Sequence, residues 1–382
     1  MIRLVNSLLF EAVRQKASDI HLQPYEDRMV TRLRIDGVLF DAYTIPKGLQ
    51  DETLSRVKVL SRMDIAEKRL PQDGRATVQV GDRLVDLRVS SIPSSYGERI
   101  VIRLLDKAAR LYRLPELGME GEIRSNFVEL LGYENGLILV TGPTGSGKST
   151  TLYAALQELN SKEKNIVTLE DPIEYQLMGI SQVQVSDKRG MTFAKGLRSV
   201  VRQDPDVIMV GEIRDAETAQ MGIQASLTGH LVFSTLHTNS AASAVTRLLD
   251  LGVEPYLVAS TLVGVLAQRL VRQICARCRS ETALLDLDAT RLSIPHGTMI
   301  YRGEGCESCR QTGYSGRLGL FEFMIVDEPI RQLILRAATA SEIEKYATAQ
   351  GMRLLREHGR QRVLDGQTTP QEVYRVTTRA TI

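Results

Sequence analysis

The chain has 382 residues, a length that favours two or three packed domains over a single core. Hydrophobic residues make up 43% of it and charged residues 25%, which is typical of a globular protein and excludes a disordered tail. The 48 Lys and Arg against 46 Asp and Glu give a net charge of only +2, so no global charge attracts nucleic acid or an anionic membrane. The longest apolar runs, such as Leu262 to Ala267, are far shorter than the ~18 residues of a membrane-spanning helix.

Residues 1–105 are predicted to form a separate α+β domain. Residues 1–13 have apolar side chains at helical spacing but lack the basic region and cleavage site of a signal peptide, so a cytoplasmic location is expected. The charged segment 106–119 is expected to be a linker. The predicted strands of this domain are Val30–Ile35, Leu84–Val89 and Arg99–Leu104.

Short apolar runs alternate with helical segments from Gly136 onward, a pattern typical of parallel strands buried on both faces. We therefore expect an α/β core over residues 120–274, then a cysteine-bearing element at 275–309 and a helical portion at 310–382. The core strands are expected at Leu137–Thr141, Ile166–Leu169, Val207–Val210 and Leu231–Leu236.

A phosphate-binding loop follows the first of these strands and leads into a helix that extends to Leu159. Its glycines allow backbone N–H groups to surround phosphate oxygens at a helix N-terminus. Lys148 is expected to reach the β- and γ-phosphates, and Ser149 to ligate Mg²⁺. No Asn-Lys-x-Asp motif follows, so ATP is favoured over GTP. The residues expected to bind nucleotide are Gly142, Pro143, Thr144, Gly145, Ser146, Gly147, Lys148, Ser149 and Thr150.

Two acidic segments follow apolar strands, where α/β sheets build their sites. Gly211 stands where most P-loop families have a magnesium-associated Asp, so another acid must help to organise the metal and the water. Glu212 is predicted to position or deprotonate the attacking water, and Glu170 is the second choice. An acid at a strand end can also be a structural cap or part of a surface ion pair.

Two histidines flank the last predicted core strand. Because His230 and His237 are seven residues apart, they lie on opposite faces of an ideal strand and should not share one role. His237, at the carboxyl end, is a candidate sensor of the γ-phosphate. For His230, a structural hydrogen bond and a functional role are both open.

All four cysteines fall into two C-x-x-C pairs separated by 27 residues. Two such pairs predict a tetrahedral zinc site that is structural, because four thiolates leave no open position. Disulfides are the alternative, which a cytosolic chain disfavours. The predicted ligands are Cys275, Cys278, Cys306 and Cys309.

These motifs together resemble the type II secretion and type IV pilus assembly ATPases. The resemblance rests on the P-loop, the acidic box 170–174, the strand ending in Gly211-Glu212 and the histidine box ending at His237; it extends to the N-terminal domain through residues 18–21, 34–37 and 71–75. It implies a RecA-like P-loop NTPase core, a smaller N-terminal α+β domain, a C-terminal zinc-bearing and helical portion, and a hexameric ring. The tetracysteine element is typical of secretion and pilus-assembly members.

The resemblance also gives roles to two pairs of arginines. In the ring, the N-terminal domain closes over a nucleotide, so Arg88 and Arg103 are expected to face a γ-phosphate; the alternative is a solvated strand face. Arg198 and Arg202 lie four residues apart on one helix face and are expected to contribute across the subunit boundary, unless they form ordinary surface ion pairs.

The leading functional hypothesis is therefore an ATP-hydrolysing hexameric motor that powers pseudopilus assembly and protein export in type II secretion. It would dock on inner-membrane platform proteins and on the cytoplasmic part of a membrane anchor protein, with peripheral membrane association and without nucleic acid. Alternatives are a type IV pilus extension motor, a DNA-translocating ATPase, or a nucleotide switch that does not hydrolyse. Full-length members carry a further N-terminal domain, so the chain is expected to be truncated or a short form.

Overall fold

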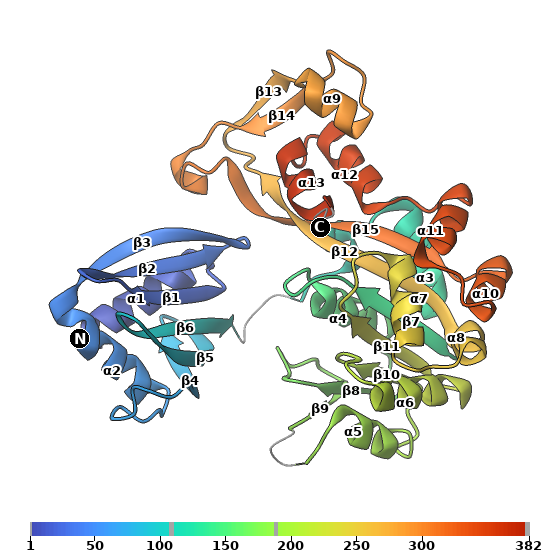
Figure 1. The fold of residues 1–382 in the computed structure, drawn as a ribbon, viewed down its shortest axis with the longest axis horizontal. Coiled ribbons are helices and arrows are strands. Elements are labelled where there is room, and N and C mark those ends of the chain that lie inside the picture. Colours follow the sequence, from blue (N-terminus) through green and yellow to red (C-terminus); the bar gives the residue numbers. More distant parts are fainter. Residues whose placement is uncertain (1, 107–110, 187–189, 379–382) are drawn as a thin grey trace. The chain divides into compact units, whose positions relative to one another are not determined.

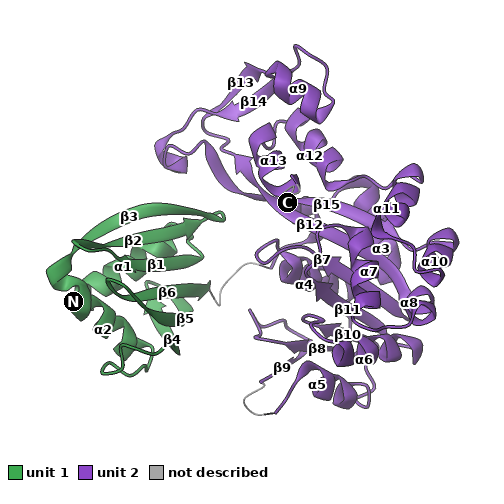
Figure 2. Ribbon diagram, in the orientation of Figure 1, with its two compact units in different colours: residues 1–110 green, residues 111–382 purple. Residues whose placement is uncertain are grey.

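The computed structural model describes residues 2–106, 111–186 and 190–378, which divide into two compact units, residues 1–110 and 111–382 (Figure 2). The expected linker, 106–119, includes residues 107–110, which lie outside the described residues. Leu114–Leu117 form a 3₁₀ helix, η2, within the second unit. In the described ranges no helix is both long and apolar enough to cross a membrane.

The first unit is a six-stranded antiparallel sheet in the order β3-β2-β1-β6-β5-β4, with two helices packed on one face (Figure 1). Helix α1 buries Val5, Leu8 and Ala12, which recur at helical spacing, against alternate strand residues such as Ile100 and Ile102. The elements are α1 (Ile2–Arg14), β1 (Asp19–Pro24), β2 (Arg28–Ile35), β3 (Val38–Pro46), α2 (Gln50–Leu60), β4 (Gln72–Val80), β5 (Arg83–Ser94) and β6 (Gly97–Asp106).

The second unit is built on a seven-stranded sheet in the order β15-β12-β7-β11-β10-β8-β9, parallel except for the pairing of β15 with β12 (Figure 1). Helices cover both faces, so consecutive residues of β7 are all buried: Leu137 and Leu139 join one core cluster, and Ile138 and Val140 the other. This explains why the core strands are apolar without alternation.

The central elements of this unit, in chain order, are α3 (Gly121–Leu131), β7 (Gly136–Thr141), α4 (Lys148–Leu159), β8 (Ile166–Glu170), β9 (Ser181–Gln184), α5 (Phe193–Val200), β10 (Val207–Val210), α6 (Ala216–Leu227), β11 (Leu231–Leu236), α7 (Ala241–Asp250), α8 (Pro255–Thr261) and β12 (Leu262–Ile274). Helices α3 and α4 pack on one face of the sheet, and α5 to α8 on the other.

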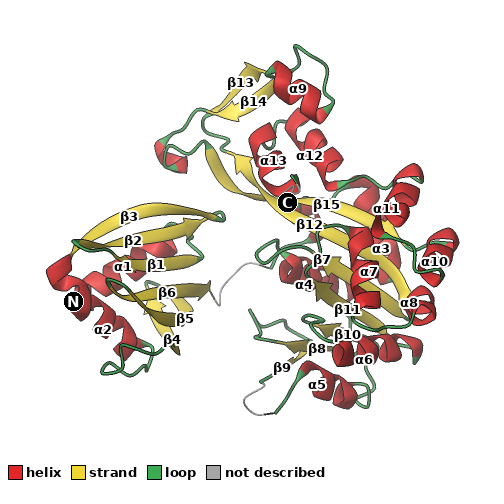
Figure 3. Ribbon diagram, viewed as in Figure 1, coloured by secondary structure: helices red, strands yellow, loops and turns green. Residues whose placement is uncertain are grey.

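The C-terminal part contributes to the same sheet. Residues 310–382, expected to be helical, begin with the long strand β15, which pairs with β12 (Figure 3). Most of β15 is buried without alternation, so no period-2 pattern identified it. Between β12 and β15 lies an excursion of two strands and a helix. The elements are β13 (Arg279–Ala283), α9 (Asp286–Leu292), β14 (Met299–Gly303), β15 (Tyr314–Ile325), α10 (Glu328–Leu335), α11 (Ala340–Ala349), α12 (Leu355–Leu364) and α13 (Pro370–Thr377).

A buried ion pair ties α2 to the sheet of the first unit. Lys58 Nζ lies 2.6 Å from Glu98 Oε1, and the two side chains are only 1% and 6% exposed. Lys58 Nζ also donates to the carbonyl of Glu67, and Ser91 Oγ donates to Glu98. The pair therefore holds α2, β6 and the loop after α2 together.

We expect Lys58→Met to lower the free energy of unfolding of this unit by about 3–5 kcal/mol, because Glu98 would remain buried without its counter-charge. Adding Glu98→Met should restore most of that loss. Urea denaturation measures both. As a control, Lys68→Met breaks the exposed pair with Asp51 and should cost no more than about 1 kcal/mol. Equal losses for Lys58→Met and Lys68→Met would contradict the role given to the buried pair.

Candidate nucleotide and metal sites

The phosphate-binding loop lies at the carboxyl end of β7, and α4 begins at Lys148. Two of its glycines are required by the approach of β12. A Cβ on Gly142 (φ +152°) would lie 2.5 Å from the carbonyl oxygen of Gln268, and one on Gly147 (φ +88°) would lie 2.8 Å from Gln268 Nε2. A side chain at either position would clash, and both backbones are in a region that glycine favours.

Inside the loop, Lys148 is folded onto its own backbone. Its Nζ donates to the carbonyls of Gly142 at 2.8 Å and Pro143 at 3.1 Å. Burial lowers the pKa of Lys148 to about 8; Glu212 opposes this shift and the positive charge of Arg269 adds to it. Ser146 Oγ is buried without a hydrogen-bond partner among the described residues. A buried hydroxyl, an amine and the N-terminus of a 12-residue helix are a donor set that fits phosphate.

Glu212 and His237 meet at the same edge of the sheet, after β10 and β11. Their side chains are 3.4 Å apart, and Arg214 donates to the Glu212 carboxylate at 2.5 Å. Burial raises the pKa of Glu212, but hydrogen bonds and charge from Arg214 and His237 outweigh it, so the pKa lies below its ordinary value. Glu212 is therefore an ionised acceptor beside an exposed imidazole.

Glu170, the second predicted acid, faces the core. Its carboxylate accepts hydrogen bonds from the hydroxyls of Tyr153 and Thr168 and from Gln182. Burial and the charge of Glu170 raise the pKa of Tyr153, so this phenol stays a donor. The next residue, Asp171, is more exposed and lies 3.9 Å from Arg214. The acidic box therefore presents Asp171 to the Glu212 cluster, while Glu170 anchors α4 to β8.

The other three predicted residues of this unit, His230, Arg198 and Arg202, form contacts elsewhere. His230 binds the carbonyl of Ala225 through Nδ1 at 2.8 Å, at the end of β11 opposite to His237, which is a structural hydrogen bond. Arg198 forms an exposed ion pair with Glu217 at 2.8 Å, and Arg202 donates to the carbonyl of Arg198. In this structure, both arginines contribute to the surface around α5.

The arginines of the first unit belong to a row that crosses its sheet on the face opposite to the helices. Arg103 lies directly opposite Arg88, and its Nε donates to Asp19 Oδ1 at 3.1 Å. Asp19 is 6% exposed. Across the sheet, each residue of this row lies opposite the next one on the neighbouring strand. From strand to strand, the row consists of Arg34, Asp19, Arg103, Arg88 and Arg75. Neighbouring cations of this kind are costly unless an anion balances them, and Asp19 supplies one negative charge.

Three residues of the candidate nucleotide site were missed by the sequence analysis: Arg214, Gln268 and Arg269. Arg214 follows Glu212 by two residues, and nothing in the pattern separates it from a surface arginine. Arg269 had a usable signal, because it and Gln268 interrupt the apolar stretch from Leu262 to Val271, and a charged residue there is buried only with a partner.

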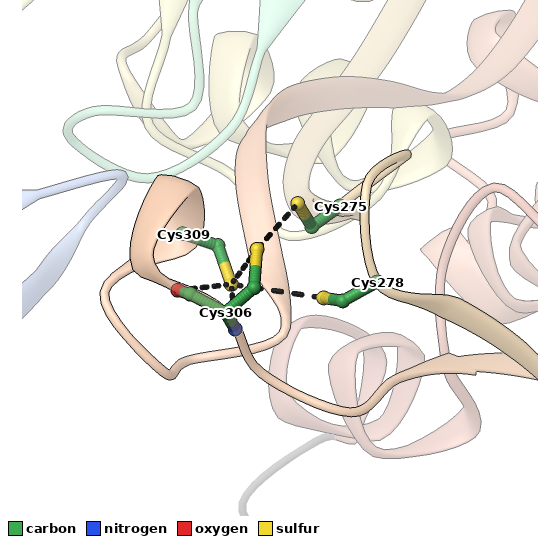
Figure 4. A group of neighbouring side chains, drawn as sticks. All are labelled: Cys275, Cys278, Cys306 and Cys309. Carbon is green, nitrogen blue, oxygen red and sulfur yellow. Dashed lines mark hydrogen bonds between the residues drawn. The ribbon is translucent and has the colours of Figure 1, made fainter.

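The four cysteines converge between the start of the excursion and its return (Figure 4). The Sγ atoms of Cys275 and Cys306 are 3.9 Å apart, and those of Cys278 and Cys309 are 3.7 Å apart. Such spacings match a tetrahedron with metal–sulfur bonds of about 2.3 Å and are far too long for disulfides. Backbone N–H groups of Cys306 and Gly313 donate to Cys309 Sγ, which suits a thiolate. The set fits a four-coordinate metal.

Comparison with known proteins assigns the family. A family model described as type II/IV secretion system protein matches residues 1–375. The type II secretion system protein E of Aeromonas hydrophila is 52% identical over 386 residues, 99% of this chain and 75% of that protein. The type II secretion system ATPase E of Vibrio cholerae is 51% identical over 380 residues, with the same coverage. A crystal structure of the pilus retraction motor PilT with bound ADP aligns with a TM-score of 0.67 at 26% identity, covering 98% of this chain and 97% of that one.

These findings confirm the predicted fold class and the predicted resemblance. The names of the relatives support the type II secretion interpretation over the pilus-extension alternative. Because the matched residues span nearly the whole chain, both units belong to one family architecture. The chain is a member of the type II/IV secretion system protein family.

Proposed function

We propose that the chain hydrolyses ATP in a site shared between the subunits of a hexameric ring, and that hydrolysis drives pseudopilus assembly and protein export in type II secretion. The observation that carries this proposal is the convergence of Lys148, Glu212 and His237 at the carboxyl edge of one parallel sheet. Phosphoryl transfer uses a cation that binds phosphate and an acceptor that orients the attacking nucleophile, and the imidazole of His237 lies beside that acceptor.

Each residue has a distinct part in this proposal. Residues 142–150 cradle the phosphates, and Lys148 leaves its carbonyl partners to bind the β- and γ-phosphates. Ser149 ligates Mg²⁺, which when bound neutralises charge on the phosphates. Glu212 orients the attacking water and accepts its proton, while His237 senses whether the γ-phosphate is present. Glu170 acts from the core by fixing α4.

Arginines complete the site from a neighbouring subunit. Arg88 and Arg103 occupy the sheet face that α1 and α2 leave uncovered, where a neighbouring copy can meet them. An arginine supplied in trans stabilises the charge of the transition state and is worth ~10³ or more in rate. Arg198 and Arg202 are proposed to assist at the same boundary.

The partners in this proposal are inferred from the family to which the chain belongs. We infer docking on inner-membrane platform proteins and on the cytoplasmic part of a membrane anchor, with peripheral association to the inner membrane. The net charge of +2 gives no support for nucleic acid as a partner.

The test is ATP hydrolysis per subunit as protein concentration rises, for the wild type alone and fused to a hexamer-forming partner. Specific activity should climb with concentration and with fusion. Glu212→Gln should lower kcat by ~10² or more, and Arg103→Ala by ~10³. Arg28→Ala is the control, because Arg28 is a half-exposed arginine of the same unit paired with Asp27. Activity that is flat with concentration and indifferent to Arg103 would contradict a shared site.

We also propose that the four cysteines hold structural Zn²⁺. The purified protein should contain about one zinc per chain, and Cys306→Ser should lose it, because three thiolates bind far more weakly than four. Metal analysis together with the mass of the intact chain checks this. Ser308→Ala, in the same turn, should keep the metal. Reduced cysteines without metal, or a mass lowered by a disulfide, would refute zinc.

A further inference from the structure

Strand β12 runs past the end of its neighbour and forms the floor of the phosphate-binding loop. Strand β7 ends at Thr141, opposite Ala267, whereas β12 continues to Ile274. The next two residues of β12, Gln268 and Arg269, therefore lie where the loop leaves the sheet. Because they are consecutive on a strand, their side chains point to opposite faces.

Gln268 supports the loop from the side of α4. It is 1% exposed, and its Oε1 accepts a hydrogen bond from Thr151 Oγ1 at 2.8 Å. Its backbone carbonyl oxygen excludes a side chain at Gly142, and its side-chain nitrogen Nε2 excludes one at Gly147. Gln268 thus fixes the distance between the loop and the strand.

Arg269 reaches the opposite face and holds the turn that follows His237. Its NH2 group donates to both the backbone carbonyl of Asn239, at 3.0 Å, and its Oδ1, at 3.2 Å. Its NH1 group donates to the carbonyl of Gln268 at 3.0 Å. One buried guanidinium therefore joins the floor of the loop to the histidine turn. Its planar fork makes this geometry unavailable to a lysine.

The same turn is held on its far side by β15. Glu322 is 3% exposed and lies opposite Ala267 in the sheet; its carboxylate accepts the backbone N–H of Ala241 at 2.7 Å. Residues 237–241 are therefore fixed between a cation on one strand and a carboxylate on the next. His237, at the start of this turn, lies 3.4 Å from Glu212. The place of the turn therefore bears on this contact, together with the hydrogen bonds between Thr238 and Thr141.

We propose that Arg269 is a positioning residue for ATP hydrolysis, which fixes His237 beside Glu212 by tying the Asn239 turn to the floor of the phosphate-binding loop. This inference rests on the proposed function. It assigns Arg269 to the chemical step rather than to nucleotide binding, because Gln268, Lys148 and the loop glycines remain when Arg269 is removed. A misplacement of ~1 Å in such a site costs up to ~10² in rate.

The experiment compares variants in the hexamer-forming fusion, measuring kcat, KM for ATP and binding of a fluorescent ADP. Arg269→Met should lower kcat ~10–100-fold while ADP affinity changes less than about threefold. Arg269→Lys should recover little, because it lacks the fork. Arg272→Met is the matched control: Arg272 is a partly buried arginine of the same strand that pairs with Glu372, away from the turn, so kcat should be kept.

Asn239 is exposed, so its variants avoid the risk that a buried change prevents folding. Asn239→Ala should lower kcat less than Arg269→Met does, because the backbone contact remains. The double variant should be no slower than Arg269→Met alone, and Asn239→Asp, which keeps the acceptor, should stay near wild type. Additive losses would show that the two residues act separately and would overturn the proposal.

Amide hydrogen exchange with ADP bound tests the same proposal without turnover. Arg269→Met should speed exchange in residues 237–241 at least tenfold, while residues 142–150 keep the protection of the wild type. Unchanged exchange in the turn, or a loss of ADP binding that matches the loss of kcat, would refute a positioning role. A wild-type ring that never hydrolyses ATP would instead refute the proposed function, and the exchange result would still decide the role of Arg269.

Discussion

Burial of the central sheet on both faces is the constraint on which the rest of the second unit depends. The central strands are mainly apolar, and the charged residues collect where they end. The phosphate-binding loop, Glu212 and His237 all follow parallel strands that end at one edge of the sheet. Strand β12 then continues beyond that edge and places Gln268 and Arg269 beneath the loop, which is why glycine is needed at two positions of the loop.

The sequence carried enough information for the motifs but not for what supports them. The phosphate loop, the cysteine pairs and most central strands could be predicted, because each depends on local spacing. Strand β15 was not predicted: it is buried on both faces like the other core strands, but Gly319 and Glu322 interrupt its apolar run. The orientation of Glu170 also lay beyond the pattern: besides Thr168 on its own strand, its hydrogen-bond donors come from two other elements, α4 and β9.

Both units carry positively charged residues at their candidate surfaces. In the second unit, Lys148 and Arg269 are buried cations, and burial lowers the pKa of each. In the first unit, cations line one face of the sheet, with Asp19 as a buried counter-charge between Arg34 and Arg103. In the proposed shared site, a nucleotide that carries several negative charges would lie against Lys148 of one subunit and against the arginines of a neighbouring subunit.

Mixing two inactive variants tests the shared site most directly. Chains with Arg103→Ala keep Glu212, and chains with Glu212→Gln keep Arg103, so some boundaries in a mixed ring contain both wild-type residues. If subunits are arranged at random, about a quarter of the boundaries are complete, and we predict that a 1:1 mixture regains hydrolysis toward that fraction of wild type. A mixture that stays as inactive as its two components would contradict the account.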